Sequence, residues 1–93
     1  MEEVKCAWCN CEWTHQKEVN IYDRKYEDSD VGVHLRYRGI GQEWSMDSNC
    51  KGNPSPRRDG LTIRLDCEQC DKPSLLKIYQ HKGHTLVEVE RIV

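Results

Sequence analysis

The sequence has 93 residues, which suits one domain with a small core, and we treat 1–93 as a single domain. It is strongly hydrophilic, with a mean hydropathy of −0.88 and no phenylalanine, so we expect a metal ion or disulfides to stabilise the fold. The net charge of −2 argues against nonspecific nucleic-acid binding, in which lysine and arginine neutralise phosphates.

Segment 1–5 is acidic and lacks the apolar run of a secretory signal, and no stretch is apolar over the length of a membrane span. We therefore expect no membrane association and a cytoplasmic location. In a reducing cytosol the six cysteines are expected to be metal ligands or free thiols, and a disulfide framework is the alternative.

Alternation of apolar and polar residues, which is typical of strands, begins early in the chain. Val19 and Ile21 suggest a first strand, and the charged segment 23–30 is expected to be a loop. Segment 31–37 should be the next strand, because its apolar residues all point one way. These residues are Val31, Val33, Leu35 and Tyr37.

A turn and a long connection should follow this strand. Gly39 and Gly41 predict a tight turn, and Trp44 and Met46 suggest a return strand. Segment 46–60 contains two prolines and two glycines, so we expect it to be the longest irregular part of the chain.

Three further strands are expected in the second half, through 61–67, 76–78 and 87–89. Cys67 keeps the parity of the apolar residues before it, so this strand should deliver a thiol to the buried face. No segment shows a helical stripe. The predicted fold is therefore mainly β, a zinc-ribbon-like antiparallel sheet with two CxxC knuckles around one structural zinc.

A hairpin is expected between the last two strands. Lys82 and Gly83 would form its two-residue turn, since glycine tolerates the positive φ that such turns require. His81 and His84 then become cross-strand neighbours. They supply only two ligands, with no carboxylate obviously near, so we do not expect a second metal site there.

Two CxxC pairs carry the most specific signal in the sequence. A spacing of two residues lets both sulfurs of a tight turn reach one ion, and two such turns complete a tetrahedral shell of Cys6, Cys9, Cys67 and Cys70. Asn or Asp follows each pair, and both residue types tolerate the left-handed conformation that a knuckle often needs. Four thiolates leave no open position, so we expect structural zinc rather than zinc catalysis. Redox activity of a CxxC is the rival interpretation.

The remaining chemistry-bearing residues do not form a catalytic motif. Cys11 and Cys50 are interpreted as small core residues or free thiols, although Cys11 lies close enough in sequence to compete as a ligand. Ser55 and Ser74 lack a nucleophile context, and no phosphate-binding glycine loop is present. We therefore predict that the chain is not an enzyme, with no small-molecule substrate evident.

Segment 52–60 is the best candidate for partner binding. Its two prolines reduce the entropy lost on binding, and Arg57 and Arg58 offer forked donors for phosphate or carboxylate. Asn53 belongs to the same candidate surface, as do two arginines of segment 31–38, Arg36 and Arg38. An internal role is equally open for the loop, because an arginine can brace the zinc thiolates or the acidic segment 23–30.

Three segments also carry a resemblance: Gly52–Gly60 (GNPSPRRDG), Cys67–Cys70 (CEQC) and Gln80–Thr85 (QHKGHT). With the N-terminal pair and Thr14-His15, they make the chain resemble an uncharacterised family of small zinc-ribbon-like proteins from bacteriophages, prophages and their hosts. Cys11 and Cys50 depart from that pattern. The resemblance implies a phage or mobile-element context and no assigned activity.

The predicted function is a non-enzymatic, zinc-stabilised binding module that acts on a host or phage protein, for example by inhibiting a defence complex. The acidic balance of the chain favours a protein partner. The alternative is a nucleic-acid-binding zinc-ribbon regulator, in which Arg36 and Arg38 share one strand face and Arg57, Arg58 and Arg64 join them.

Overall fold

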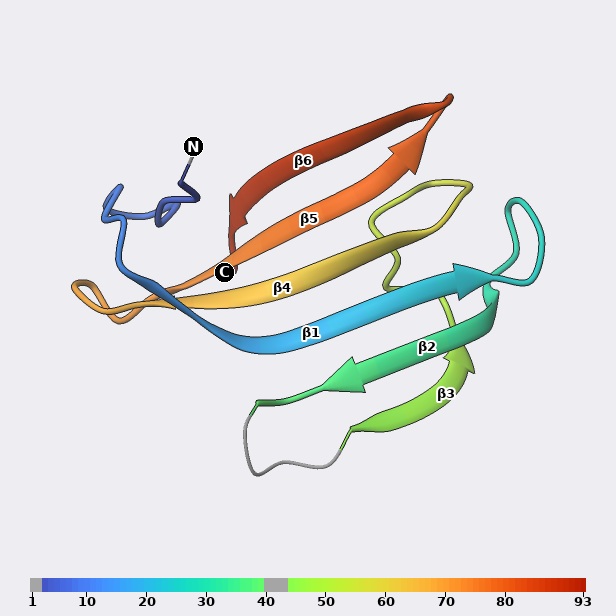
Figure 1. Cartoon of the computed structure of the whole chain (residues 1–93), viewed down its shortest axis with the longest axis horizontal. Helices are drawn as coiled ribbons and strands as arrows, with labels where there is room; N and C mark the ends of the chain where they lie inside the picture. Colours follow the sequence, from blue (N-terminus) through green and yellow to red (C-terminus); the bar gives the residue numbers. More distant parts are fainter. Residues whose placement is uncertain (1–2, 40–43) are drawn as a thin grey trace.

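Six antiparallel strands form one open sheet in the order β3-β2-β1-β4-β5-β6 (Figure 1). The computed structural model describes residues 3–39 and 44–93. Its strands are β1 (Thr14–Arg24), β2 (Val31–Tyr37), β3 (Ser45–Asn49), β4 (Gly60–Cys67), β5 (Pro73–His81) and β6 (His84–Arg91). This part of the chain forms no helix, and hence none that is long and apolar enough to cross a membrane.

One face of the sheet, which we call the apolar face, collects the alternating apolar side chains of every strand. Cross-strand pairing aligns them in two rows that run across the sheet. The first row is Tyr37, Val19, Ile63, Leu76 and Val89, and the second is Met46, Leu35, Ile21, Leu61, Ile78 and Val87. Of the aliphatic residues in the described chain, only Leu65 and Leu76 are buried.

The opposite face, which we call the polar face, carries most of the charged side chains. One of its rows is Ser45, Arg36, Asn20, Thr62, Lys77 and Glu88. Lys77 Nζ lies 3.3 Å from a Glu88 carboxylate oxygen and 3.0 Å from one of Glu90, and Arg36 pairs with Glu18. The sheet is thus amphipathic, with its charges paired on one side.

The connection from β3 to β4 packs on the polar face at one end of the sheet. Cys50, at its start, is fully buried, and a Cβ at Gly52 would lie 2.6 Å from the Tyr22 hydroxyl oxygen, so the backbone passes directly over this buried tyrosine. Ser55 is also buried, and its hydroxyl donates to the Gln80 carbonyl at 2.6 Å. The connection is therefore anchored to β1 and β5.

Most of the strand predictions are confirmed, with two corrections. The strand at 31–37 has the expected bounds, and Lys82-Gly83 forms the predicted hairpin turn, with φ of 50° and 81°. The first strand is longer than Val19 and Ile21 suggested, because it runs from Thr14 to Arg24; the prediction that 23–30 is a loop is therefore wrong for Asp23 and Arg24, which pair with β2. The prediction that 46–60 is irregular is wrong for 46–49, which pair with β2; only 50–59 is irregular. Gly41 lies outside the described residues.

Candidate metal centre

Two turns bring the four paired cysteines together. The first lies ahead of β1 and the second joins β4 to β5. Their hydrogen bonds match: Asn10 N donates to Cys6 O at 2.9 Å, and Asp71 N donates to Cys67 O at 3.1 Å. Asn10 and Asp71 have φ of 64° and 58°, so the predicted left-handed residue follows each pair. Each CxxC therefore forms a knuckle of the expected geometry.

The sulfur atoms of the four cysteines form one compact cluster. All lie within 4.8 Å of one another, with Sγ–Sγ distances of 3.6 Å between Cys6 and Cys70 and 3.5 Å between Cys9 and Cys67. A tetrahedral ion with metal–sulfur bonds of about 2.3 Å places its ligands about 3.8 Å apart. The cluster therefore could hold a tetrahedral metal ion, as the spacing of the cysteines predicted.

Backbone N–H groups lie close enough to the sulfurs of Cys6 and Cys67 to stabilise negative charge on them. Trp8 N lies 3.3 Å from Cys6 Sγ, and Gln69 N and Cys70 N lie 3.4 and 3.5 Å from Cys67 Sγ. Burial opposes ionisation of Cys6, but N–H groups of this turn and the neighbouring thiols lower its pKa to about 6. Burial, together with the thiols of Cys6 and Cys67, raises the pKa of Cys70. Four adjacent thiolates thus need a cation between them.

The N-terminal knuckle is also held to the sheet by direct contacts. Ala7 N donates to Ser74 Oγ at 2.9 Å, and Trp8 Nε1 donates to the Pro73 carbonyl at 2.7 Å. Arg91 Nε donates to the Ala7 carbonyl at 3.0 Å, and its guanidinium lies 4.9 Å from the centre of the Trp8 ring. These contacts fasten the first knuckle to β5 and β6.

The other two cysteines lie outside the cluster. Cys50 is fully buried, with its sulfur 3.8 and 3.7 Å from the carbonyl oxygens of Asp23 and Val33, and burial raises the pKa of its thiol. It is a small core residue. Cys11 is partly exposed, and its sulfur lies 3.4 Å from Trp13 N. His81 and His84 pair at the hairpin, at the opposite end of β5 from the knuckles, so they lie away from the cysteine cluster.

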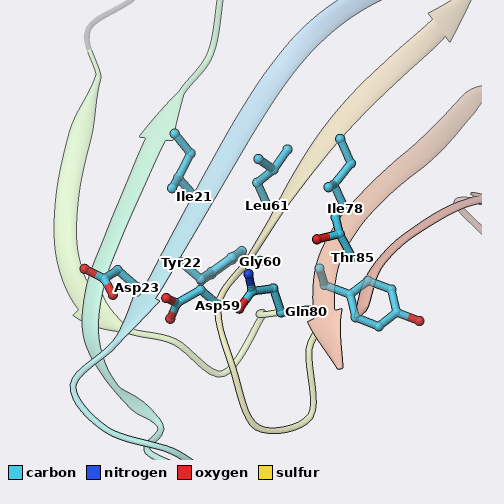
Figure 2. A pocket seen from close by; sticks show the side chains of 10 residues that line it. Ile21, Tyr22, Asp23, Asp59, Gly60, Leu61, Ile78, Gln80 and Thr85 are labelled. Atoms are coloured by element: carbon cyan, nitrogen blue, oxygen red, sulfur yellow. The ribbon is translucent and has the colours of Figure 1, made fainter. Parts of the chain in front are cut away.

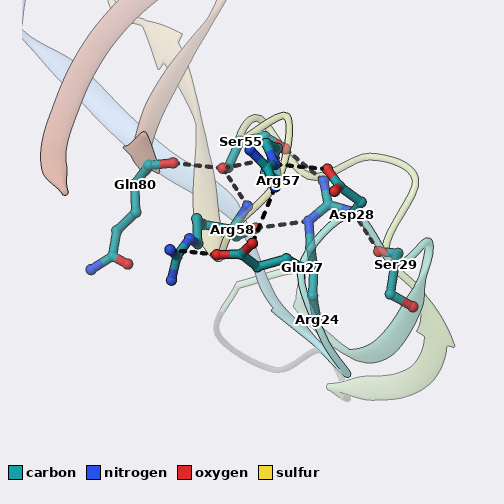
Figure 3. Close-up of polar contacts among 8 residues, drawn as sticks. All are labelled: Arg24, Glu27, Asp28, Ser29, Ser55, Arg57, Arg58 and Gln80. Carbon is teal, nitrogen blue, oxygen red and sulfur yellow. Dashed lines mark hydrogen bonds and ion pairs between the residues drawn. The ribbon is translucent and has the colours of Figure 1, made fainter. Parts of the chain in front are cut away.

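Arg57 and Arg58 lie against the acidic segment that follows β1 (Figure 3). Arg57 Nη2 is 3.2 Å from Glu27 and its Nε is 3.1 Å from Asp28, while Arg58 also pairs with Glu27. The side chains of Arg57 and Arg58 are still 58% and 54% exposed. The loop backbone is held from within, since Asn53 Nδ2 donates to the Arg58 carbonyl at 2.7 Å.

Arg24 is the residue of this region that the sequence interpretation missed. Its guanidinium donates to three carbonyls: Arg58 O at 2.8 Å, Ser55 O at 2.6 Å and Ser29 O. These contacts join β1, the acidic segment and the 50–59 connection (Figure 3). Arg57 and Arg58 thus make the contacts with the acidic segment that the internal interpretation described, and Arg24 adds a second brace through the loop carbonyls.

Arg36 and Arg38 lie apart from that loop, at the end of the polar face nearer the knuckles. They line a hollow of about 450 Å³ together with Lys17 and Arg64, and Glu18 and Asp66 line it as well. Arg36 pairs with Glu18, and Arg64 Nε is 3.1 Å from Asp66. Arg64 therefore lies in one hollow with Arg36 and Arg38, as the nucleic-acid interpretation expected, but Arg57 and Arg58 do not join them. Two carboxylates reduce the positive charge of this hollow.

His34 forms a polar network that no sequence signal indicated. Its ring stacks on Tyr22, with ring centroids 4.5 Å apart and planes at 9°. Its Nε2 is 2.7 Å from Asn20 Oδ1 and its Nδ1 is 3.1 Å from Asp47 Oδ1. These contacts link β1, β2 and β3 across the polar face.

Comparisons with protein-family models, with curated proteins and with solved structures found no match to this chain.

Proposed function

We propose that this chain is a non-enzymatic binding module with a zinc-ribbon-like metal site, in which Cys6, Cys9, Cys67 and Cys70 hold one structural zinc ion. Four thiolates are a favoured set of ligands for zinc, and a full shell leaves no position for a reacting water. The zinc supplies a cross-link between the segment before β1 and the β4–β5 turn. The residues support a stabilising metal, not a reaction centre.

The partner in this proposal is a protein, bound at the arginine loop, which we define as residues 52–60. The observation that carries the proposal is a braced backbone with exposed charges. Internal hydrogen bonds from Arg24, Asn53 and Ser55 fix the loop, yet Arg57 and Arg58 remain more than half exposed. A preformed loop loses little conformational entropy when it binds.

The charge pattern of this surface indicates the chemistry of the partner. Glu27 and Asp28 neutralise part of the charge of Arg57 and Arg58, so the loop presents both signs side by side. A protein surface with its own paired charges complements such a pattern better than a polyphosphate does. The resemblance to phage proteins supports, within this proposal, a partner in the cytoplasm of a host cell, and inhibition of a host complex is one such function.

A pull-down tests the proposal with two matched double variants. Arg57→Ala with Arg58→Ala removes two positive charges from the arginine loop, and Arg38→Ala with Arg64→Ala removes two from the other basic hollow. The first variant should lose the protein partner at least tenfold, and the second should retain it. Capture that survives nuclease treatment supports a protein partner, and equal capture by the first variant and the wild type contradicts the proposal.

Nucleic-acid binding is the second candidate, and the hollow lined by Lys17, Arg36, Arg38 and Arg64 favours it. If nucleic acid is the partner, the variant with Arg38→Ala and Arg64→Ala should lose binding, and the variant with Arg57→Ala and Arg58→Ala should retain it. Binding should also weaken steeply between about 50 and 200 mM salt, since phosphate contacts release counterions. Titration of labelled single- and double-stranded oligonucleotides at several salt concentrations measures this.

A further inference from the structure

Much of the apolar face of the sheet is exposed in the described chain, although Leu65 and Leu76, nearer the knuckles, are buried. Met46 and Val87, on the two edge strands, are 63% and 61% exposed, and Ile21, on the inner strand β1, is 43% exposed. Figure 2 shows part of this face, where Ile21, Leu61 and Ile78 project into a hollow of about 360 Å³. Asp23, Asp59, Gln80 and Thr85 form its polar rim.

A single layer leaves this fold with little core. Half of the valine, isoleucine, leucine and methionine residues of the chain stand in the two rows of the apolar face. Domains bury such a face against a second layer. An antiparallel sheet tolerates water on one face only, and here the polar face already has that role.

The other parts of the described chain are engaged elsewhere. The 50–59 connection packs over Tyr22 on the polar face, and the N-terminal knuckle is fastened at Pro73 and Ser74, at the zinc end of the sheet. Neither provides a layer over Ile21 or Met46, which remain exposed. Among the described residues, none therefore supplies a layer over this part of the face.

We propose that this layer is a second copy of the same chain, so that two sheets pack face to face in a twofold-symmetric sandwich. The fold needs its cover from the moment it forms, and a second copy is present wherever the chain is made. Sheets of this kind pack about 10 Å apart with their strands within roughly 30° of parallel.

The charge distribution suits a self-complementary contact. Neither apolar row contains Asp, Glu, Lys, Arg or His. A twofold axis through these rows places apolar side chains against apolar side chains, whereas the paired charges of the polar face remain in water. Isologous interfaces must be self-complementary in this way.

The available area also suits a stable dimer. Six strands about 4.8 Å apart, over about 20 Å of strand length, give a flat projection of roughly 600 Å². Protruding side chains make the accessible area larger than this projection. Stable interfaces bury about 800 Å² on each partner, so the area of the apolar face is of the same order.

Light scattering coupled to size-exclusion chromatography tests this inference on the zinc-bound protein. We expect a mass of about 22 kDa, twice the chain mass of 11.0 kDa. Met46→Glu should raise the dissociation constant of the dimer at least a hundredfold, because symmetry buries the charge twice. Ser45→Glu is the matched control, since its side chain lies on the polar face of the same edge strand beside Arg36, and it should remain dimeric.

Methionine oxidation provides a second measurement that needs no variant. Met46 should react with hydroxyl radicals at least fivefold more slowly than free methionine at high protein concentration, and the protection should fade on dilution. A wild-type monomer at about 100 µM, or dimers that persist in both Met46→Glu and Val87→Glu, would overturn the inference. Neither result bears on the arginine loop, whose test uses a different surface.

Discussion

Replacement of Arg24 by alanine should destabilise the protein far more than replacement of either exposed arginine of the loop. Arg24→Ala removes a charged donor from the carbonyls of Arg58, Ser55 and Ser29. The bond to Arg58 is exposed, so water replaces it, but the other two are partly buried. At about 1.5 kcal/mol for each partly buried bond, the expected loss is about 3 kcal/mol.

Urea denaturation followed by tryptophan fluorescence, at fixed zinc and protein concentrations, measures this loss. Arg57→Ala is the matched control and should cost less than about 1 kcal/mol, because its ion pairs are exposed. Arg24→Lys should fall between the two, since an ammonium cannot serve three carbonyls with the fixed fork of a guanidinium. If Arg24→Ala and Arg57→Ala cost the same, the bracing role of Arg24 is wrong.

Three further predictions concern the metal, a carboxylate and a glycine. Cys67→Ser should lose the metal and unfold, whereas Cys11→Ser should keep one zinc per chain by metal analysis; mapped disulfides without zinc would contradict this. A hydrogen bond from Tyr79 lowers the pKa of Glu88, so its stabilisation exists above the ordinary glutamate pKa and is lost as the pH falls through the folded pKa. The difference in urea midpoint between wild type and Glu88→Gln should therefore shrink on acidification, and a constant difference would contradict the assignment. Gly32→Ala should cost at least about 1–3 kcal/mol in the same denaturation assay, because its Cβ would lie 2.1 Å from a carbonyl oxygen of β1; an unchanged midpoint would show that the hairpin relaxes freely.

Alternation in the sequence predicts the faces of the strands well, because side-chain parity is a local property. The alternating apolar residues singled out for β2, β4, β5 and β6 fall on one face as expected, whereas Leu75, Tyr79 and Leu86 lie on the other. Strand order is not local. Nothing in the sequence indicates that β1 lies between β2 and β4, and β3 is too polar to show a clear period.

The cysteine cluster can be predicted because its geometry is encoded locally, whereas the contacts of Arg24 are long-range and cannot. A CxxC knuckle is encoded within about six residues, including the left-handed position occupied by Asn10 or Asp71. Arg24 acts on carbonyls from Ser29 to Arg58, and these become neighbours only after the sheet has formed. His34 is similar, since its partners come from two other strands.

The strand order divides the sheet into two halves, β3-β2-β1 and β4-β5-β6, that share a single seam between β1 and β4. Within each half, successive strands are neighbours, whereas the seam joins Thr14 to Cys67. Contacts stabilise both ends of the seam. The cysteine cluster, which includes Cys67, lies at one end, and the hydrogen bonds of Arg24 lie at the other. If the cysteine cluster holds the proposed metal ion, its removal should let β1 and β4 separate progressively along this seam. Amide exchange would begin at the Thr14 end of the seam, while the β5–β6 hairpin remains protected.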